Sequence, residues 1–182
     1  KDMHGLQIWI ALPKELENME PNFVHIDSKD IPTWKEGSLE MKLIAGEKKK
    51  KKSAVPVYSK LYMLEVKANE DQTVNFHNRL YGESGLYILN GSISHEANSF
   101  ESKQILITKD AHLCTFEMKA GTTVYLFGGE PFPEERFIYW NFVSSSRETI
   151  EKAKIDWFEQ KFEKVPGETG YVPLPPNPFK KD

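Results

Sequence analysis

The chain has 182 residues, of which 39% are hydrophobic and 28% charged, so it can bury a core and is not disordered as a whole. Its 24 basic and 27 acidic residues give a net charge of −3, which excludes a broad basic surface for binding nucleic acid. The single cysteine excludes a disulfide framework and a cysteine-rich zinc site, and no apolar run is long enough to cross a bilayer.

The first predicted element is a β-strand over Leu6–Leu12. Aliphatic side chains at every second position alternate there with other residue types, which is the period of a strand. Residues 27–37 contain Pro32 and Gly37 and are typical of a connection. We therefore predict a linker over residues 21–38.

A run of five lysines, Lys48–Lys52, follows a short predicted strand over Leu39–Ile44. Five like charges repel one another and are costly to bury. The run therefore predicts a solvated loop. The functional alternative is a loop that contacts phosphates or acidic lipid.

Short strand patterns separated by turn signals fill most of the chain between residues 58 and 143. The predicted strands are Leu61–Val66, Thr73–Phe76, Gly85–Leu89, Ser92–His95, Gln104–Thr108, Leu113–Met118, Thr122–Phe127 and Phe137–Val143. Asn90-Gly91 lies between two of them and predicts a hairpin, because both residues tolerate positive φ. Many short strands at this spacing predict an all-β fold, either a sandwich or a barrel.

The exception to the strand pattern is a predicted α-helix over Ser146–Phe162. Its apolar residues recur at helical spacing, and Ser145 stands three residues before a glutamate, as in a capping box. Trp157 and Phe158 are predicted to anchor the helix on the β-core. The proline-rich segment Val165–Asp182 predicts an extended tail.

Several segments resemble pirin-like proteins when they are taken in order. His4–Pro13 resembles the His-Gly-x-Gln-x-Trp-x-x-Leu-Pro segment of that family. Asn141–Ser146, leading into Ile150–Trp157, resembles its C-terminal passage from strand to helix. Gly128–Pro131 resembles its Gly-Glu-Pro turn, and Val165–Glu168 resembles the tail of its bacterial branch.

Pirin-like proteins are bicupins, with two antiparallel barrel-like domains in one chain, so the resemblance implies a cupin barrel with one C-terminal helix. The implied division is residues 1–20 as remnant strands of the N-terminal cupin, 21–38 as a linker, 39–143 as the C-terminal cupin barrel, 144–163 as the helix and 164–182 as the tail. In the family, the N-terminal cupin holds one iron with three histidines and a glutamate. Those ligands lie upstream of the His-Gly-x-Gln segment, so the resemblance implies no cofactor in this chain.

The resemblance also indicates where a metal site would lie in the second cupin. The first cupin motif supplies His-x-His, a glutamate and then a glycine, and such a set suits iron, manganese or nickel. Here the matching positions are His77, Arg79, Ser84 and Gly91, with Glu83 one residue out of register and so on the opposite face. The second motif offers His112, without the usual Pro-x-Gly before it.

His77 and His112 are therefore weak metal-ligand candidates, and surface or hydrogen-bonded histidines are the alternative. Arg79 is a candidate anion ligand at the barrel mouth, with an exposed or ion-paired arginine as the alternative. His4 is a candidate neighbour of the iron site in the first cupin, with a structural role as the alternative. Cys114 is interpreted as a buried apolar residue rather than a nucleophile. No catalytic residue is predicted.

Three functional hypotheses follow. The first is a non-catalytic structural or regulatory cupin that packs on a metal-binding N-terminal cupin, or on a second copy of the chain. The second is the inert half of a metal-dependent dioxygenase of the quercetin type, an activity linked to the family together with transcription-cofactor roles in animals. The third is a protein-binding module. A cytoplasmic location is predicted because a single cysteine is typical of a reducing compartment, and neither nucleic acid nor membrane is expected as a partner.

Overall fold

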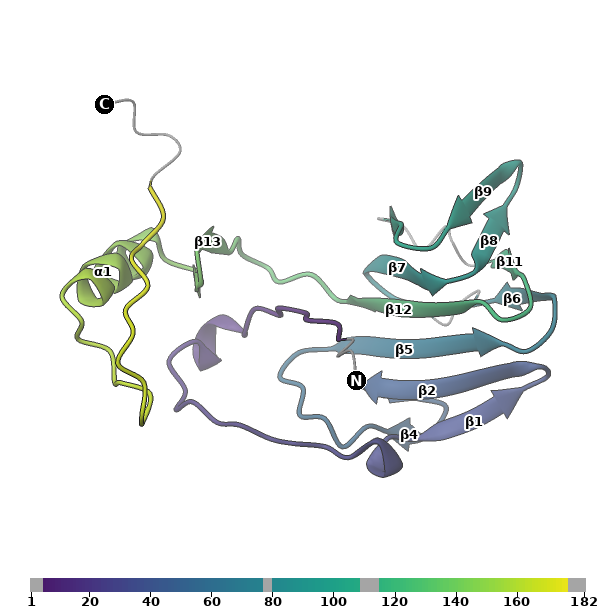
Figure 1. Cartoon of the computed structure of the whole chain (residues 1–182), viewed down its shortest axis with the longest axis horizontal. Coiled ribbons are helices and arrows are strands. Elements are labelled where there is room, and N and C mark those ends of the chain that lie inside the picture. The colour runs from purple at the N-terminus through teal and green to yellow at the C-terminus, as the bar shows by residue number, and fades with distance from the viewer. Residues whose placement is uncertain (1–4, 77–79, 109–114, 177–182) are drawn as a thin grey trace. The chain divides into compact units, whose positions relative to one another are not determined.

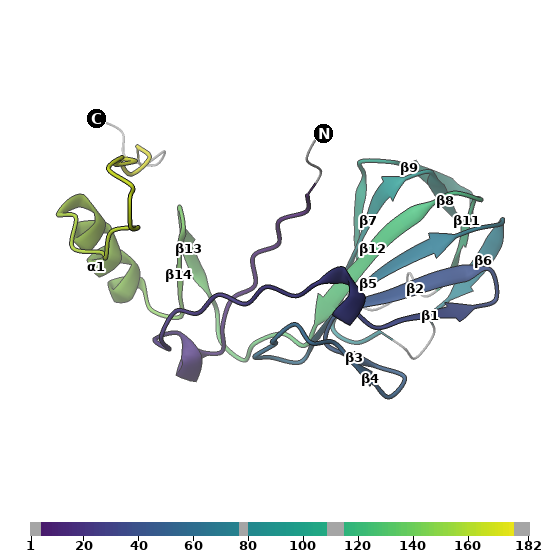
Figure 2. The ribbon, with the colours of Figure 1, turned by 60° about the horizontal axis from the view of Figure 1, so that its bottom comes forward.

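The computed structural model describes residues 5–76, 80–108 and 115–176 (Figures 1 and 2). The chain divides into two compact units, each of which is described by itself. The barrel unit is Glu20–Pro131, and the helix unit combines Lys1–Met19 with Phe132–Asp182. No helix in the described ranges is long and apolar enough to cross a membrane.

The barrel unit is built from two antiparallel β-sheets that enclose its core (Figure 2). One sheet has the order β1 (Thr33–Glu36), β2 (Leu39–Ala45), β5 (Leu61–Ala68), β12 (Thr123–Gly129), β7 (Glu83–Asn90) and β10 (Ile105–Thr108). The other has the order β6 (Gln72–Asn75), β11 (Thr115–Met118), β8 (Ser92–His95) and β9 (Asn98–Glu101). The unit also contains the short 3-10 helix η2 (Ser28–Asp30). The predicted all-β class is confirmed.

The core forms because every second residue of the long strands is apolar and faces inward. In β2, Leu39, Met41 and Leu43 are buried and alternate with partly exposed residues. Phe76, which directly follows β6, and Phe116 of β11 are both 2% exposed, and their ring centroids lie 6.2 Å apart. The interior of the barrel is therefore filled largely by aliphatic and aromatic side chains.

The Asn90-Gly91 turn carries the chain from one sheet to the other and does not close a hairpin. β7, before it, pairs with β12 and β10, whereas β8, after it, pairs with β11 and β9. Gly91 has φ +80°, and a Cβ there would lie 2.3 Å from Thr122 Oγ1. Asn90 Nδ2 also donates to the Gly121 carbonyl at 2.6 Å. The dipeptide therefore specified a tight turn correctly, but tertiary contacts decide which strands pair.

The lysine run forms a small hairpin whose lysines are exposed or partly exposed, so their predicted solvation is confirmed and the predicted loop is corrected to a hairpin. β3 (Glu47–Lys48) pairs with β4 (Lys51–Lys52), and the two turn lysines have positive φ, +49° and +63°. Lys49 Nζ lies 2.8 Å from Glu36, and Lys52 Nζ lies 3.0 Å from Glu47. Acidic partners thus relieve the repulsion that the sequence predicts.

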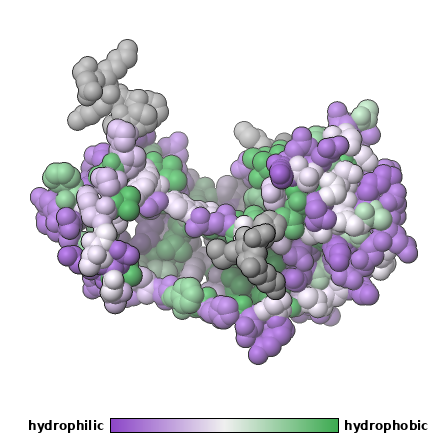
Figure 3. All heavy atoms as spheres, viewed as in Figure 1, coloured by the Kyte–Doolittle hydropathy of each residue, from purple (hydrophilic) through white to green (hydrophobic). Residues whose placement is uncertain are grey.

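The edge of the six-stranded sheet carries exposed isoleucines. Ile105 and Ile107 of β10 are 54% and 66% exposed, while the alternate residues Leu106 and Thr108 are partly buried. Hydrophobic side chains gather near the β7 side of this sheet in Figure 3. The predicted strand is thus present. Its outward-facing residues are apolar, whereas the outer face of an antiparallel sheet is commonly polar.

Tyr125, on the outer face of β12, predicts a loss of stability at alkaline pH. Burial, and then the hydrogen bond that its hydroxyl donates to Glu65 at 2.7 Å, raise the pKa of Tyr125 to about 12. Tyrosines in the unfolded chain ionise near pH ~10. As the pH rises, Tyr125 therefore loses its proton in the unfolded chain before it does so in the folded one. Its contribution to the free energy of unfolding is present below about pH 10 and disappears as the pH rises through about 12.

We expect Tyr125→Phe to abolish this contribution. Urea unfolding at about pH 9 and about pH 11 should show a larger loss of stability for the wild type than for the variant. Equal losses in the two proteins would contradict the assignment.

The helix unit contains a 3-10 helix, a β-hairpin and one α-helix. These are η1 (Lys14–Leu16), the paired strands β13 (Phe137–Tyr139) and β14 (Phe142–Ser144), and α1 (Arg147–Phe158). The strand predicted over Phe137–Val143 is thus two strands joined by a turn in which Trp140 has φ +50°. Leu6–Leu12, predicted as a strand, is assigned to none in the described part of the chain. A strand needs a hydrogen-bonded neighbour that local alternation cannot supply.

Helix α1 begins one residue later than the capping pattern predicts. Ser146 is the N-cap, and its hydroxyl accepts from the Thr149 amide at 3.3 Å. Ser145 instead donates to Glu17 through its amide (2.8 Å) and its hydroxyl (3.0 Å). Phe158, a predicted anchor, ends the helix and is 75% exposed.

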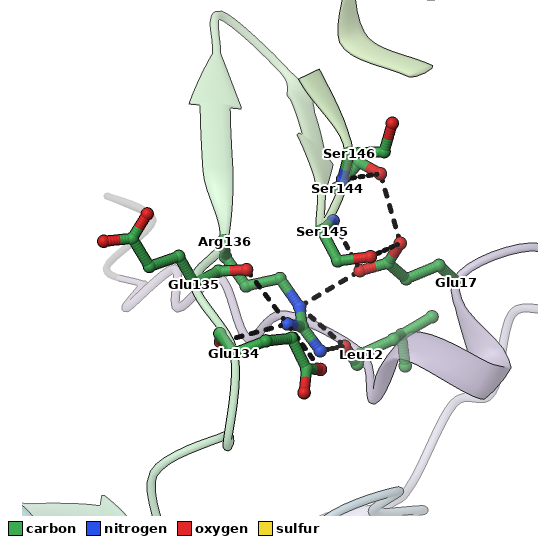
Figure 4. A network of polar contacts seen from close by, with 8 residues as sticks. All are labelled: Leu12, Glu17, Glu134, Glu135, Arg136, Ser144, Ser145 and Ser146. Atoms are coloured by element: carbon green, nitrogen blue, oxygen red, sulfur yellow. Dashed lines mark hydrogen bonds and ion pairs between the residues drawn. The ribbon is translucent and has the colours of Figure 1, made fainter. Parts of the chain in front are cut away.

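A polar clamp ties the first segment of the helix unit to its hairpin (Figure 4). Arg136, whose side chain is 11% exposed, donates to the Leu12 carbonyl from Nε (3.3 Å) and Nη2 (3.1 Å). Its Nε also lies 3.0 Å from Glu17 Oε1. Glu17 in turn accepts from Ser144 Oγ at 3.1 Å and from Ser145. Residues more than a hundred positions apart are thereby held in one network.

Candidate ligand site of the barrel

Three predicted candidates, His77, Arg79 and His112, lie outside the described residues, as do His4 and Cys114. Their roles remain predictions. Ser84, which stands at the position of the cupin glutamate, is described and lies in β7. It is 2% exposed, whereas its neighbour Glu83 is exposed, as the strand alternation predicts.

Ser84 forms a buried hydrogen bond with Tyr62 of β5. Ser84 Oγ and Tyr62 Oη lie 2.6 Å apart, and Tyr62 is 1% exposed. The strand between them, β12, places Gly128 opposite both residues in the sheet register. A Cβ on Gly128 would lie 2.6 Å from Tyr62 Oη, so the glycine leaves room for the two side chains to meet across β12.

Aromatic rings and lysines surround this pair. The Tyr81 ring meets the Tyr62 ring edge-on, with centroids 5.0 Å apart. Lys60 Nζ lies 4.8 Å from the centroid of the Tyr81 ring, and Lys48 Nζ lies 5.6 Å from those of Tyr62 and Phe76. These distances are within the range of cation–π attraction. The first lysine of the hairpin therefore contacts the rings beside the Ser84 position.

The electrostatics of this region favour neutral phenols and charged lysines. Burial raises the pKa of Tyr81, and the nearby Lys60 ammonium opposes that shift. The hydrogen bond and ion pair with Glu130 raise the pKa of Lys60. These shifts keep the Tyr81 phenol neutral and the Lys60 ammonium charged at neutral pH. The hydroxyls of Ser84 and Tyr62 are buried and hydrogen-bonded to each other, and Lys60 is paired with Glu130.

The described residues do not fit the iron set that the cupin resemblance implies. At the position of the carboxylate ligand this chain has the neutral hydroxyl of Ser84. That hydroxyl is hydrogen-bonded to Tyr62. Within residues 5–76, 80–108 and 115–176, no three His, Cys, Asp or Glu side chains cluster so that they could hold a metal ion.

Most of the residues around the Ser84–Tyr62 pair could not be predicted from the sequence. The sequence pattern does not mark Tyr62, Tyr81 or Lys60 as functional residues, and it predicts a solvated Lys48. The usable signal was Gly128 within a β-branched and aromatic strand, because a glycine in a strand often marks a close approach of neighbouring groups.

Two histidines of the barrel unit, His25 and His95, have partners of their own. His25 pairs with Asp27 at 3.2 Å, and its side chain is 74% exposed. His95 Nδ1 lies 2.7 Å from the Thr115 carbonyl. In the helix unit, Trp157 of α1 packs against Trp140 with ring centroids 5.0 Å apart.

We expect Ser84→Ala to destabilise the barrel unit by about 1–2 kcal/mol, because the buried Tyr62 hydroxyl loses this partner. The double variant Ser84→Ala/Tyr62→Phe should recover part of the loss, since both polar groups are then gone. Urea unfolding of the single and double variants measures this coupling. Strictly additive losses would show that the two hydroxyls do not interact.

Comparison with known proteins assigns the chain to a protein family. The family model described as the pirin C-terminal cupin domain matches residues 63–163. A pirin-like protein of Caulobacter vibrioides is 36% identical over 175 residues, which cover 95% of this chain and 60% of the relative. Pirin-1 of Arabidopsis thaliana is 29% identical over 168 residues, with 85% of this chain and 56% of the relative covered.

A solved structure agrees with these relatives. The crystal structure of quercetin 2,3-dioxygenase from Acinetobacter baumannii superimposes with a TM-score of 0.79 at 27% identity, covering 96% of this chain and 59% of that chain. The chain thus spans roughly three fifths of the length of these proteins. The family match over more than half of the residues, and the fold it shares with that structure, establish that the chain belongs to the pirin family and contains its C-terminal cupin domain.

Proposed function

We propose that this chain acts as a cupin without a metal of its own, which packs on a metal-binding N-terminal cupin as a structural or regulatory domain. The observation that carries the proposal is the buried Ser84–Tyr62 hydrogen bond at the position of the carboxylate ligand. A hydroxyl pair inside a barrel packed with apolar side chains stabilises the fold and leaves the first cupin to hold iron.

Exposed apolar residues of the segment Leu6–Leu12 support a partner domain. Leu6, Trp9 and Ile10 are 42%, 55% and 57% exposed. Leu6, Ile8, Ile10 and Leu12 alternate with other residues as in a strand, and an unpaired strand is a template for a neighbouring sheet. The Arg136 clamp holds the end of this segment at the Leu12 carbonyl. We propose that the segment adds to the sheet of the N-terminal cupin.

Hydrogen exchange tests this pairing. In this chain alone, the amides of residues 6–12 should exchange rapidly, and in a protein that also carries the N-terminal cupin they should be protected. Rapid exchange in both proteins would overturn the proposed packing. Protection that appears in this chain alone as its concentration rises would identify a second copy as the partner.

A second candidate is the inert half of a dioxygenase. It is favoured by the similarity to the Acinetobacter baumannii structure named quercetin 2,3-dioxygenase. Oxygen consumption with a flavonol should then occur with the two-cupin protein and not with this chain. Activity in this chain alone would contradict both proposed functions. Inactivity in both this chain and the two-cupin protein would contradict the dioxygenase function.

A further inference from the structure

The C-terminal proline-rich segment lies on aromatic side chains of the helix unit. Trp157 Nε1, on α1, donates to the Val172 carbonyl at 2.9 Å. Tyr139 Oη, on β13, donates to the Pro175 carbonyl at 2.9 Å. The two accepting carbonyls are three residues apart, and each donor is an aromatic side chain.

The sequence of this segment favours a polyproline II conformation. Residues 172–176 read Val-Pro-Leu-Pro-Pro. Proline fixes its own φ and restricts the residue before it to extended or polyproline II backbone. That helix has three residues per turn, so the carbonyls of Val172 and Pro175 point to the same side. The spacing of the two hydrogen bonds therefore matches the repeat of the segment.

Neighbouring contacts fix the two donors in place. The Trp157 ring is held edge-on by Trp140, with centroids 5.0 Å apart, and stacks on Tyr171 at 6.1 Å. Lys154 Nζ lies 4.7 Å from the centroid of the Tyr139 ring and is itself paired with Glu151 at 2.8 Å. Trp140 and Lys154, which lie outside the tail, thus contact the two donors, and Tyr171 of the tail adds a stacking contact to Trp157.

The tail is held loosely. Tyr171 and Val172 are 42% and 63% exposed, and only Leu174 of the described proline-rich residues is half-buried. A hollow of about 310 Å³ remains beside the tail, lined by residues that include Trp157, Phe162, Val165 and Tyr171. Because little apolar surface is covered, the segment can leave the groove at small cost.

We propose that Tyr139 and Trp157 form a polyproline-binding groove whose built-in ligand is residues 172–176 of the same chain. Aromatic grooves with hydrogen-bond donors are a recurring way of binding proline-rich peptides, because such peptides are already ordered. A peptide with the same Val-Pro-Leu-Pro-Pro pattern should therefore compete with the tail.

The test uses the full chain with nitrogen-labelled tryptophan and follows the Trp157 indole N–H by NMR. In Pro173→Ala/Pro175→Ala, the tail should be released and the indole proton should exchange roughly 10-fold faster. A synthetic peptide of residues 170–176 should then restore the wild-type shift. It should bind the wild type more weakly than the proline variant, since the attached tail competes with it.

Matched controls separate recognition from misfolding. A peptide with both prolines replaced by alanine should not bind, and this comparison needs no change in the protein. Trp157→Phe should lose peptide binding, whereas Trp9→Phe, at a residue that is 55% exposed, should retain it. Equal binding of the two peptides, or unchanged indole exchange in the proline variant, would overturn the proposal. Indole protection that depends on protein concentration would overturn the assignment to the chain's own tail.

Discussion

Arg136→Ala is expected to lower the free energy of unfolding of the helix unit by about 3 kcal/mol, because it removes one partner of a buried ion pair. Glu17, whose side chain is 13% exposed, would keep its charge without the guanidinium. The Leu12 carbonyl would also lose both of its hydrogen bonds from Arg136. Urea unfolding followed by tryptophan fluorescence measures the loss in a Trp34→Phe background, since the other three tryptophans lie in the helix unit.

Two further variants test whether the clamp acts as described. Arg136→Lys keeps the charge but not the forked donor geometry, so it should lose most of the same stability. Lys152→Ala removes an ion pair with Asp156 from a lysine that is 76% exposed, and should change stability by less than ~0.5 kcal/mol. Equal effects of Arg136→Ala and Lys152→Ala would show that the clamp contributes nothing beyond a surface ion pair.

Gly128→Val is expected to prevent stable folding of the barrel unit or to destabilise it by more than about 3 kcal/mol, through overpacking and a broken hydrogen bond. A Cβ at this position would lie 2.5 Å from the Glu83 carbonyl and 2.6 Å from Tyr62 Oη. The backbone and the ring cannot both withdraw, because β12 pairs with β5 and β7 on its two sides. Circular dichroism during urea unfolding reports the loss of the sheets.

Gly5→Ala is the control, since nothing lies within 4 Å of a Cβ at that position. It should be neutral within ~0.5 kcal/mol. Gly128→Ala should be milder than Gly128→Val, and adding Tyr62→Phe should rescue part of its loss by removing the nearest hydroxyl. A Gly128→Val protein as stable as the wild type would refute the crowded geometry.

Much of the fold was predictable because alternation of apolar residues reports which face of a strand is buried. Leu39–Ile44, Leu61–Val66 and Thr122–Phe127 follow that pattern and lie in β2, β5 and β12. Pairing was not predictable to the same degree. Asn90-Gly91 has the local preferences of a hairpin, but its flanking strands belong to different sheets. Leu6–Leu12 alternates like a strand without a paired neighbour in the described residues.

Of the candidate site, only Ser84 could be predicted from the sequence, as the residue that stands at the carboxylate position of the cupin motif. Aligning the motif placed Ser84 where a carboxylate would lie, and alternation correctly put Glu83 on the outer side. The Tyr62 partner could not be inferred, since the contact crosses a whole strand and depends on Gly128. The charge run predicts a solvated Lys48, because a run of like charges does not indicate which aromatic rings its side chains contact.

The most direct test of the central claim is the iron content of this chain after incubation with Fe(II) without oxygen, followed by desalting and elemental analysis. A cupin whose carboxylate position is a serine bonded to Tyr62 should retain no stoichiometric iron. Retention of one iron per chain, lost on His77→Ala or His112→Ala, would contradict the account and establish a metal centre in this barrel.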